Sequence, residues 1–454
     1  MNIINTKKII AREVDFMIID LIAVGGFKNI GLTKLDFTGI TALVAPNGFG
    51  KSNVLNAIDF GVDFINSSPR TRNSMMHYAP NIPINKHTDK HDYSLKLVMR
   101  STLKKRHCVV EYDLSFAWAN DAGTGARITG ENLEIRYMEK NSKPIKLISR
   151  TASKALYRSS ETGRCNKGIK VNDDELVINQ LSLHNTLFYR TIAKEIGELS
   201  FYIENRLDVA GNFEPSPIVS NFFSIESLDI NNMDDAPRYI YFLRNKHPEK
   251  YEMLVHSFKS LFPDIVTLEL AERDAFDDSK LREAMNNVPE DAPFTISNKI
   301  YNIFVFDKNL NQPIPFSYLS AGTKKIFVFL AIAISAEINK VSLIALEELE
   351  NSIHPALMQQ LITILEQVVG ESRILLTSHS PYLVDYIEPQ EIYLPLPKGD
   401  GVARFGNIKG ERASKRFIND ATKYEQSLGD YIFTLLSGDE DDFETLRSYM
   451  GVEQ

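Results

Sequence analysis

The sequence has little of what marks secreted or membrane proteins. Its only two cysteines, Cys108 and Cys165, form neither a disulfide framework nor a cluster of metal ligands. The longest strongly apolar run, Ile326–Ala336, has 11 residues and is too short to cross a bilayer. Charged residues interrupt the apolar ones near the N-terminus, which is not typical of a signal peptide. The sequence therefore predicts a soluble, cytoplasmic protein with no membrane partner.

An excess of basic residues is also lacking. Lys and Arg number 51 against 59 Asp and Glu, for a net charge of −8, so no overall field attracts nucleic acid. One segment differs: residues 140–170 contain a single acidic residue, Glu161. This segment is either a solvated face or a surface for a phosphate backbone or an acidic protein partner. Its nine basic residues are Lys140, Lys143, Lys146, Arg150, Lys154, Arg158, Arg164, Lys167 and Lys170.

The most informative stretch is TALVAPNGFGKSN, residues 41–53. An apolar run meets a Pro/Asn/Gly-rich turn and then a helical pattern. Such a turn directs backbone N–H groups at a phosphate, and the helix N-terminus adds positive potential. In this arrangement Lys51 would reach the β- and γ-phosphates and Ser52 would hold Mg²⁺. An ordinary strand–turn–helix is the alternative. The predicted nucleotide-binding residues here are Asn47, Gly48, Phe49, Gly50, Lys51, Ser52 and Asn53.

Further along, short apolar strands alternate with helical patterns between residues 300 and 377, which predicts a parallel sheet with crossover helices. One buried strand ends in Glu347-Glu348, and the next ends just before His379. Leu319-Ser320-Ala321-Gly322 precedes a helix. Each feature alone has an ordinary structural interpretation, but their joint occurrence in this order favours a nucleotide site.

Four segments, APNGFGKSN, YLSAG, LIALEELENSIHP and LLTSHSPYL, give the chain its resemblance to the ABC-type ATPase superfamily. It resembles most the soluble branch of SMC, RecF and OLD-like proteins, including the ATPase subunits of phage-defence systems such as PARIS (AriA) and Septu (PtuA). The resemblance covers about residues 16–125 and 296–395. Glu347 departs from the family, where Asp is usual, and Leu349 stands where Pro is usual.

The resemblance implies roles for these residues. Because consecutive strand residues point to opposite sides, Glu347 would face Mg²⁺ while Glu348 activates the attacking water. His379 would contact the γ-phosphate. Ser320 and Gly322 would bind the γ-phosphate of ATP held by a second subunit. The glutamine that the family carries after its first helix is not identified, and His77, Asn81 and Asn85 are candidates.

The implied fold class is α/β: a P-loop parallel sheet with flanking helices, an antiparallel β layer, and a large, mostly helical insertion. Residues 1–130 and 296–400 would form the two parts of an ATPase head. Residues 131–295 would be the insertion, with a β-rich basic segment and then a helical arm, and residues 401–454 a tail. Residues 66–92 are expected to be a loop.

The implied function is that of a regulatory ATPase that dimerises, or forms a higher homo-oligomer, around ATP and Mg²⁺. It would control a separately encoded effector, a nuclease or toxin, in antiviral defence. The alternatives are a RecF- or SMC-like ATPase that binds DNA in repair, and a scaffold that binds ATP without hydrolysing it.

Overall fold

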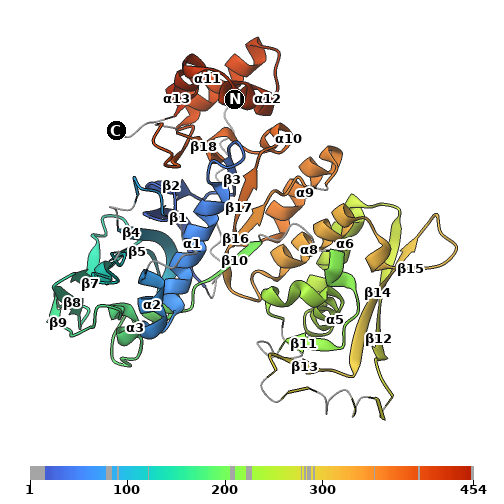
Figure 1. The fold of residues 1–454 in the computed structure, drawn as a ribbon, viewed down its shortest axis with the longest axis horizontal. Helices are drawn as coiled ribbons and strands as arrows, with labels where there is room; N and C mark the ends of the chain where they lie inside the picture. Colours follow the sequence, from blue (N-terminus) through green and yellow to red (C-terminus); the bar gives the residue numbers. More distant parts are fainter. Residues whose placement is uncertain are drawn as a thin grey trace. The chain divides into compact units, whose positions relative to one another are not determined.

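The computed structural model describes residues 16–77, 84–88, 92–120, 122–204, 210–220, 228–277, 279–280, 283, 288–289, 292–351, 353–396 and 399–450 (Figure 1). The chain divides into two compact units. Unit 1 comprises residues 1–36, 56–199 and 397–404, and unit 2 comprises residues 37–55, 200–396 and 405–454. Helix α1 (Lys51–Asn66) begins in unit 2 and continues into unit 1.

Unit 1 is built on an eight-stranded antiparallel sheet in the order β2-β1-β4-β5-β6-β7-β8-β9. Buried residues alternate with more exposed ones along β4 and β5, as a sheet with one covered face requires. Phe60 and Phe64 of α1 pack on Tyr93, Phe116 and Trp118, which fixes the helix to this face. The strands are β1 (Ile18–Gly25), β2 (Thr33–Asp36), β4 (Tyr93–Leu103), β5 (Arg106–Ala117), β6 (Arg127–Tyr137), β7 (Ile145–Thr151), β8 (Lys154–Arg158) and β9 (Cys165–Gly168).

A buried arginine holds the end of the first helix of unit 1. Arg72, 1% exposed, donates to the carbonyls of Phe64, Ile65, Ser67 and Asp174, and so closes the C-terminal end of α1. These helices are α2 (Pro69–Met76), α3 (Val177–Ser182) and α4 (Arg190–Gly197).

Unit 2 contains a six-stranded sheet in the order β10-β16-β17-β3-β18-β19, parallel except for the last strand. Every residue of β3 is buried. Helix α8 (Ala321–Ser335) is buried throughout from Lys324 onward, which explains its long apolar run. The strands are β3 (Ile40–Val44), β10 (Ser200–Glu204), β16 (Val341–Glu347), β17 (Arg373–Ser378), β18 (Ile392–Pro395) and β19 (Phe405–Asn407).

The remaining elements of unit 2 form smaller layers. A three-stranded sheet joins β12 (Ile265–Asp274), β14 (Lys299–Asp307) and β15 (Ile314–Pro315), and β11 (Ile218–Ser220) pairs with β13 (Phe294–Ile296). The helices are α5 (Ala236–Lys246), α6 (Pro248–Leu261), α9 (Pro355–Val368), α10 (Pro381–Val384), α11 (Glu411–Lys423), α12 (Leu428–Ser437) and α13 (Glu440–Tyr449), with 3₁₀ turns η1 (Ala210–Phe213), η2 (Ile230–Asp235), η3 (Phe316–Tyr318) and η4 (Pro389–Glu391).

The predicted α/β class is confirmed: a parallel sheet with flanking helices and an antiparallel β layer are both present. One local prediction is wrong. Residues 66–92 are not entirely loop, because Ser68 caps α2 and Pro69 occupies its first turn, where proline is favourable. The part of the chain predicted as a helical arm also contains a strand, β10, which joins the edge of the main sheet beside β16.

Candidate functional site

The loop between β3 and α1 has the geometry of a phosphate cradle. Gly48 and Gly50 have φ values of 77° and 127°, a region that residues with a Cβ rarely adopt. Nothing lies within 4 Å of a Cβ built on Gly48, so backbone conformation rather than crowding requires glycine there. Helix α1 starts at Lys51, with its first N–H groups directed out of the helix end.

The side chain of Lys51 turns back into this loop. Its Nζ donates to the carbonyl of Ala45 at 2.7 Å and contacts that of Pro46 at 3.4 Å. Burial lowers the pKa of the Lys51 ammonium, and the charges of Glu348, Glu350 and Glu347 oppose that shift. A cation held this way, at the start of a helix, suits the terminal phosphates of a nucleotide.

A cavity of about 310 Å³ opens at this loop. It brings Glu348 and Thr377 together with the predicted phosphate-binding residues, although the two groups are far apart in the sequence. Phe49 is not in the lining, and its ring packs edge to face on Phe405, with centroids 5.4 Å apart. The lining residues are Asn47, Gly48, Gly50, Lys51, Ser52, Asn53, Glu348 and Thr377.

The two consecutive glutamates lie in different backbone environments. Strand β16 ends at Glu347, which is paired with Thr377 of β17 and does not line the cavity. Glu348 has φ of 46°, and its N–H donates to the carbonyl of Thr377 at 3.1 Å. The separation of the two side chains therefore comes from a turn at Glu348, not from strand alternation as the sequence predicted.

A buried lysine from α8 supports this turn. Lys325, 2% exposed, donates from Nζ to the carbonyl of Glu348 at 3.0 Å and to that of Asn351 at 3.3 Å. Asn351 in turn donates from Nδ2 to the Glu348 carboxylate. Burial lowers the pKa of Lys325, and the charges of Glu350, Glu348 and Glu204 oppose that shift. These contacts hold Glu348 in its left-handed conformation.

His379 lies at the end of the neighbouring strand and faces two carboxylates. Its Nδ1 is 3.5 Å from Oε1 of Glu350 and 3.7 Å from Oε1 of Glu348. The structure thus brings His379 beside Glu348. Glu350, Lys325, Asn351 and Thr377 are not among the predicted site residues. The only feature of the sequence that could have indicated Glu350 is its position as a third acidic residue soon after the end of β16.

Ser320 and Gly322 lie at the N-terminal end of α8 and do not line the cavity with Lys51. Ser320 is the N-cap, and its Oγ accepts from the N–H of Thr323 at 3.1 Å. Ser320 and Ala321 are exposed, whereas Gly322 is buried. This corner of the fold is therefore accessible to another molecule.

The donor set of the cavity fits a magnesium–nucleotide complex. The Ser52 hydroxyl in the lining is a hard oxygen ligand, and Mg²⁺ in such sites takes only one or two protein ligands and completes its shell with phosphate and water. Among the described residues, no three His, Cys, Asp or Glu side chains are arranged to hold a metal ion by themselves.

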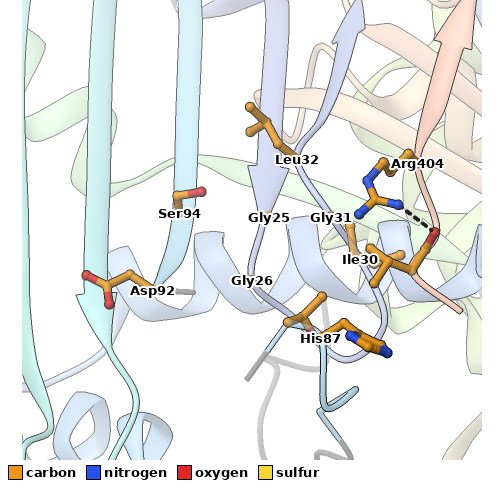
Figure 2. Close-up of a pocket in the computed structure, with 11 residues that line it drawn as sticks. Gly25, Gly26, Ile30, Gly31, Leu32, His87, Asp92, Ser94 and Arg404 are labelled. Carbon is orange, nitrogen blue, oxygen red and sulfur yellow. Dashed lines mark hydrogen bonds between the residues drawn. The ribbon is translucent and has the colours of Figure 1, made fainter. Parts of the chain in front are cut away.

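Unit 1 has a separate cavity of about 390 Å³, where Asp92 and Ser94 lie on one side of a group of glycines and Arg404 on the other (Figure 2). A Cβ on Gly26 would lie 2.2 Å from the carbonyl oxygen of Asp92, which explains glycine there. No predicted site residue lines this cavity. The adjoining turn contains Lys28, with φ of 47°.

The other sequence candidates have local contacts within unit 1. His77 contacts the carbonyl of Asn73 through Nδ1, and Asn85 donates to the carbonyl of Gly401. Asn81 lies outside the described residues. In the basic segment, Arg150 is 4% exposed and donates to the carbonyls of Asn172 and Glu175, so it is not part of a solvated face.

Comparison with known proteins gives one family match. A family model described as "AAA domain, putative AbiEii toxin, Type IV TA system" matches residues 168–385, slightly less than half of the chain. The matched segment contains Ser320, Glu348 and His379 but not the loop at Lys51. This match supports an ATPase-type domain. No curated protein matches the sequence.

Similar solved structures include a SmcHead bound to the C-winged helix domain of ScpA, with 14% identity, coverage of 88% of this chain and 99% of that chain, and a TM-score of 0.46. An SMC head domain from Thermotoga maritima has 12% identity, and the match covers 87% of this chain and 100% of that chain with a TM-score of 0.40. RecF with ATPγS has 12% identity, and the match covers 87% of this chain and 100% of that chain with a TM-score of 0.39. At these values the likeness says nothing about activity.

In the described part of the chain, no helix combines the length and apolar character needed to span a membrane.

Proposed function

We propose that this protein is an ABC-type ATPase that binds ATP with Mg²⁺ in the cavity at the end of β3. The observation that supports this proposal best is the lining of that cavity. It combines a glycine-containing loop, a lysine at a helix start and the carboxylate of Glu348. Loop N–H groups, a cation and a carboxylate are the parts that phosphoryl transfer to water requires.

Each residue has a proposed role in this reaction. The N–H groups of residues 47–53 and the Lys51 ammonium bind the phosphates. Ser52 and Glu347 would hold Mg²⁺, Glu347 through water, and the ion would supply positive charge that neutralises the phosphates. Glu348 orients the attacking water and accepts its proton, while His379 contacts the γ-phosphate. The products are ADP and inorganic phosphate.

We also propose that each site is completed by a second copy of the chain. Ser320 and Ala321 are exposed at the N-terminus of α8, and neither Ser320 nor Gly322 lines the cavity of its own chain. N–H groups at such a helix end bind anions. A homodimer, or a higher homo-oligomer, would place Ser320 and Gly322 against the γ-phosphate of the partner, so that ATP holds the assembly together and hydrolysis releases it.

The proposed biological role is regulation of a separately encoded effector, a nuclease or toxin, in antiviral defence. Support comes from the sequence resemblance and from the toxin–antitoxin description of the matching family. Residues 131–295 would act as the insertion that recognises the partner, between the two parts of the ATPase head at 1–130 and 296–400. Purification under native conditions should yield a stoichiometric effector, and its absence would contradict this role.

DNA binding in repair is the second candidate. Exposed basic side chains without a described acidic partner in the 140–170 segment, such as Lys140, Lys143 and Lys154, favour it. A repair ATPase would bind DNA strongly with ATP, and the logarithm of affinity would fall linearly with that of salt concentration. Weak binding without such dependence would exclude this candidate.

Two substitutions test the ATPase proposal. Lys51→Ala should abolish ATP binding, measured by calorimetry. Glu348→Gln should bind ATP but stop phosphate release and accumulate an ATP-bound assembly, measured by native mass spectrometry. Glu366→Gln, on the exposed face of α9, is the control and should behave as wild type. Phosphate release at the wild-type rate in the Glu348→Gln variant would mean that Glu348 does not activate water. If neither the wild type nor the variant releases phosphate, only the scaffold that binds ATP without hydrolysing it remains.

A further inference from the structure

Glu350 joins the two strand ends that carry the proposed chemistry. Its Oε1 accepts from Oγ of Ser378 at 2.7 Å and from the N–H of His379 at 2.9 Å. The side chain is 10% exposed, so these bonds lie in a protected environment. The turn that follows β16 is thereby tied to the corner at the end of β17.

One oxygen of Glu350 makes both of these bonds. The other, Oε2, is buried and has no hydrogen-bond partner among the described residues. If Glu350 only closed the corner, the amide oxygen of a glutamine would serve equally well without a buried charge. Burying a carboxylate with an unpaired oxygen is unfavourable, so the charge needs partners. Two are the ammonium groups of Lys325 and Lys51, whose pKa values the charge of Glu350 raises against the effect of burial.

The imidazole of His379 lies beside this carboxylate. Its Nδ1 is also buried without a hydrogen-bond partner in the described structure, and it lies 3.5 Å from Oε1 of Glu350 and 3.7 Å from Oε1 of Glu348. These distances are slightly longer than a hydrogen bond, so a small rotation of the ring would complete one. Such a bond would fix the orientation of the ring and therefore the position of Nε2, the nitrogen available to a substrate.

We propose that Glu350 is a positioning residue: it holds the His379 corner with one oxygen and orients the imidazole with its negative charge. This inference rests on the proposed ATPase function, in which His379 contacts the γ-phosphate. Glu350 does not line the cavity. Its charge also acts on Lys51 and Lys325, and the double variant described below separates that effect from the one transmitted through His379.

The test compares Glu350→Gln with His379→Ala and the double variant. Glu350→Gln keeps an acceptor for Ser378 but removes the charge. It should lower kcat by about ten- to a hundredfold, the usual effect of losing an outer-shell partner, with KM for ATP within about twofold of wild type. The double variant should be no slower than His379→Ala alone, because both changes remove the same interaction. Additive losses, or wild-type kcat in Glu350→Gln, would overturn the proposal.

Glu391→Gln is the matched control. Glu391 is also a partly buried carboxylate of unit 2 that accepts from a hydroxyl, that of Thr38, and burial raises its pKa. It does not line the cavity, and its substitution should leave kcat unchanged. Glu350→Asp, which retains the charge, should restore part of the activity. If Glu350→Asp restored no activity, the negative charge at position 350 would not be what supports hydrolysis.

A second readout does not depend on hydrolysis. In protein labelled at histidine with ¹⁵N, the ring signals of His379, assigned with His379→Ala, report which nitrogen carries the proton. Glu350→Gln should shift the Nδ1 signal, because the carboxylate beside this nitrogen is lost, whereas Glu391→Gln should leave it unchanged. An unchanged ring spectrum would overturn the positioning role. If wild-type protein fails to hydrolyse ATP while the ring signals shift as expected, the proposed function fails and the positioning of His379 stands.

Discussion

Lys325→Met should loosen the turn that carries Glu348. Methionine approximates the lysine stem in volume, so the change removes mainly the ammonium and its bonds to the carbonyls of Glu348 and Asn351. Each hydrogen bond from a charged donor contributes about 1.5–3 kcal/mol. The ammonium is itself desolvated, as its lowered pKa indicates, so the relief of this desolvation cost offsets part of the free energy lost with the hydrogen bonds. A net loss of about 2–4 kcal/mol in local stability is expected.

Hydrogen–deuterium exchange with mass spectrometry is the suitable assay. The single tryptophan, Trp118, belongs to unit 1 and does not report on this turn. Peptides that cover residues 341–351 should exchange about thirty- to a thousandfold faster in Lys325→Met, the equivalent of the expected loss at about 1.4 kcal/mol per factor of ten. ATP hydrolysis should fall as well, because Glu348 is released from φ of 46°.

Lys324→Met is the control for this prediction. Lys324 is its neighbour on α8 and is also buried, but its Nζ donates to the carbonyl of Ser317 at 2.9 Å. Its substitution should speed exchange near residue 317 and leave residues 341–351 unchanged. Equal effects of the two variants on residues 341–351, or no effect of Lys325→Met there, would refute the reasoning.

Two further predictions concern other parts of the molecule. Ser320→Arg should prevent ATP-driven pairing of two chains while each chain still binds nucleotide, because the exposed corner is blocked without a change in the cavity. Native mass spectrometry with a slowly hydrolysed ATP analogue measures the pairing, and pairs that persist in this variant would contradict the prediction. Arg72→Met should destabilise unit 1 by about 3–5 kcal/mol, because four carbonyls lose a buried charged donor. Its chemical denaturation, followed by Trp118 fluorescence, should have a lower midpoint, and an unchanged midpoint would show that Arg72 does not stabilise the end of α1.

Local chemistry explains which parts of the fold could be predicted from the sequence. The β3 strand, its glycine-containing turn and the start of α1 are adjacent in the chain, so their pattern could be interpreted directly. Pro69 was interpreted as a loop signal, although after the Ser68 cap it starts α2. The α13 helix lies in a segment predicted only as an acidic tail, where Asp439 and Asp442 form a capping box.

Other features depend on contacts that sequence patterns do not reveal. Strand β10 has five residues and becomes recognisable only by its parallel pairing with β16, far along the chain. The role of Glu350 depends on how the turn after Glu348 folds back on His379. Arg150 was counted with the solvated basic residues, but it is buried and bonded to the carbonyls of Asn172 and Glu175. In each case the tertiary partner determines the outcome.

The strand order of the main sheet has a consequence for biosynthesis. Strand β3 lies between β17 and β18, whose residues leave the ribosome long after residue 44 does. A nascent chain that has not reached residue 373 offers β3 neither of its neighbours. The phosphate loop therefore cannot assume its final form until β17 and β18 have been synthesised. Folding with such distant pairings is slow and exposes an apolar strand in the meantime, so the growing chain would need protection from aggregation and would gain nucleotide affinity only after these strands have emerged.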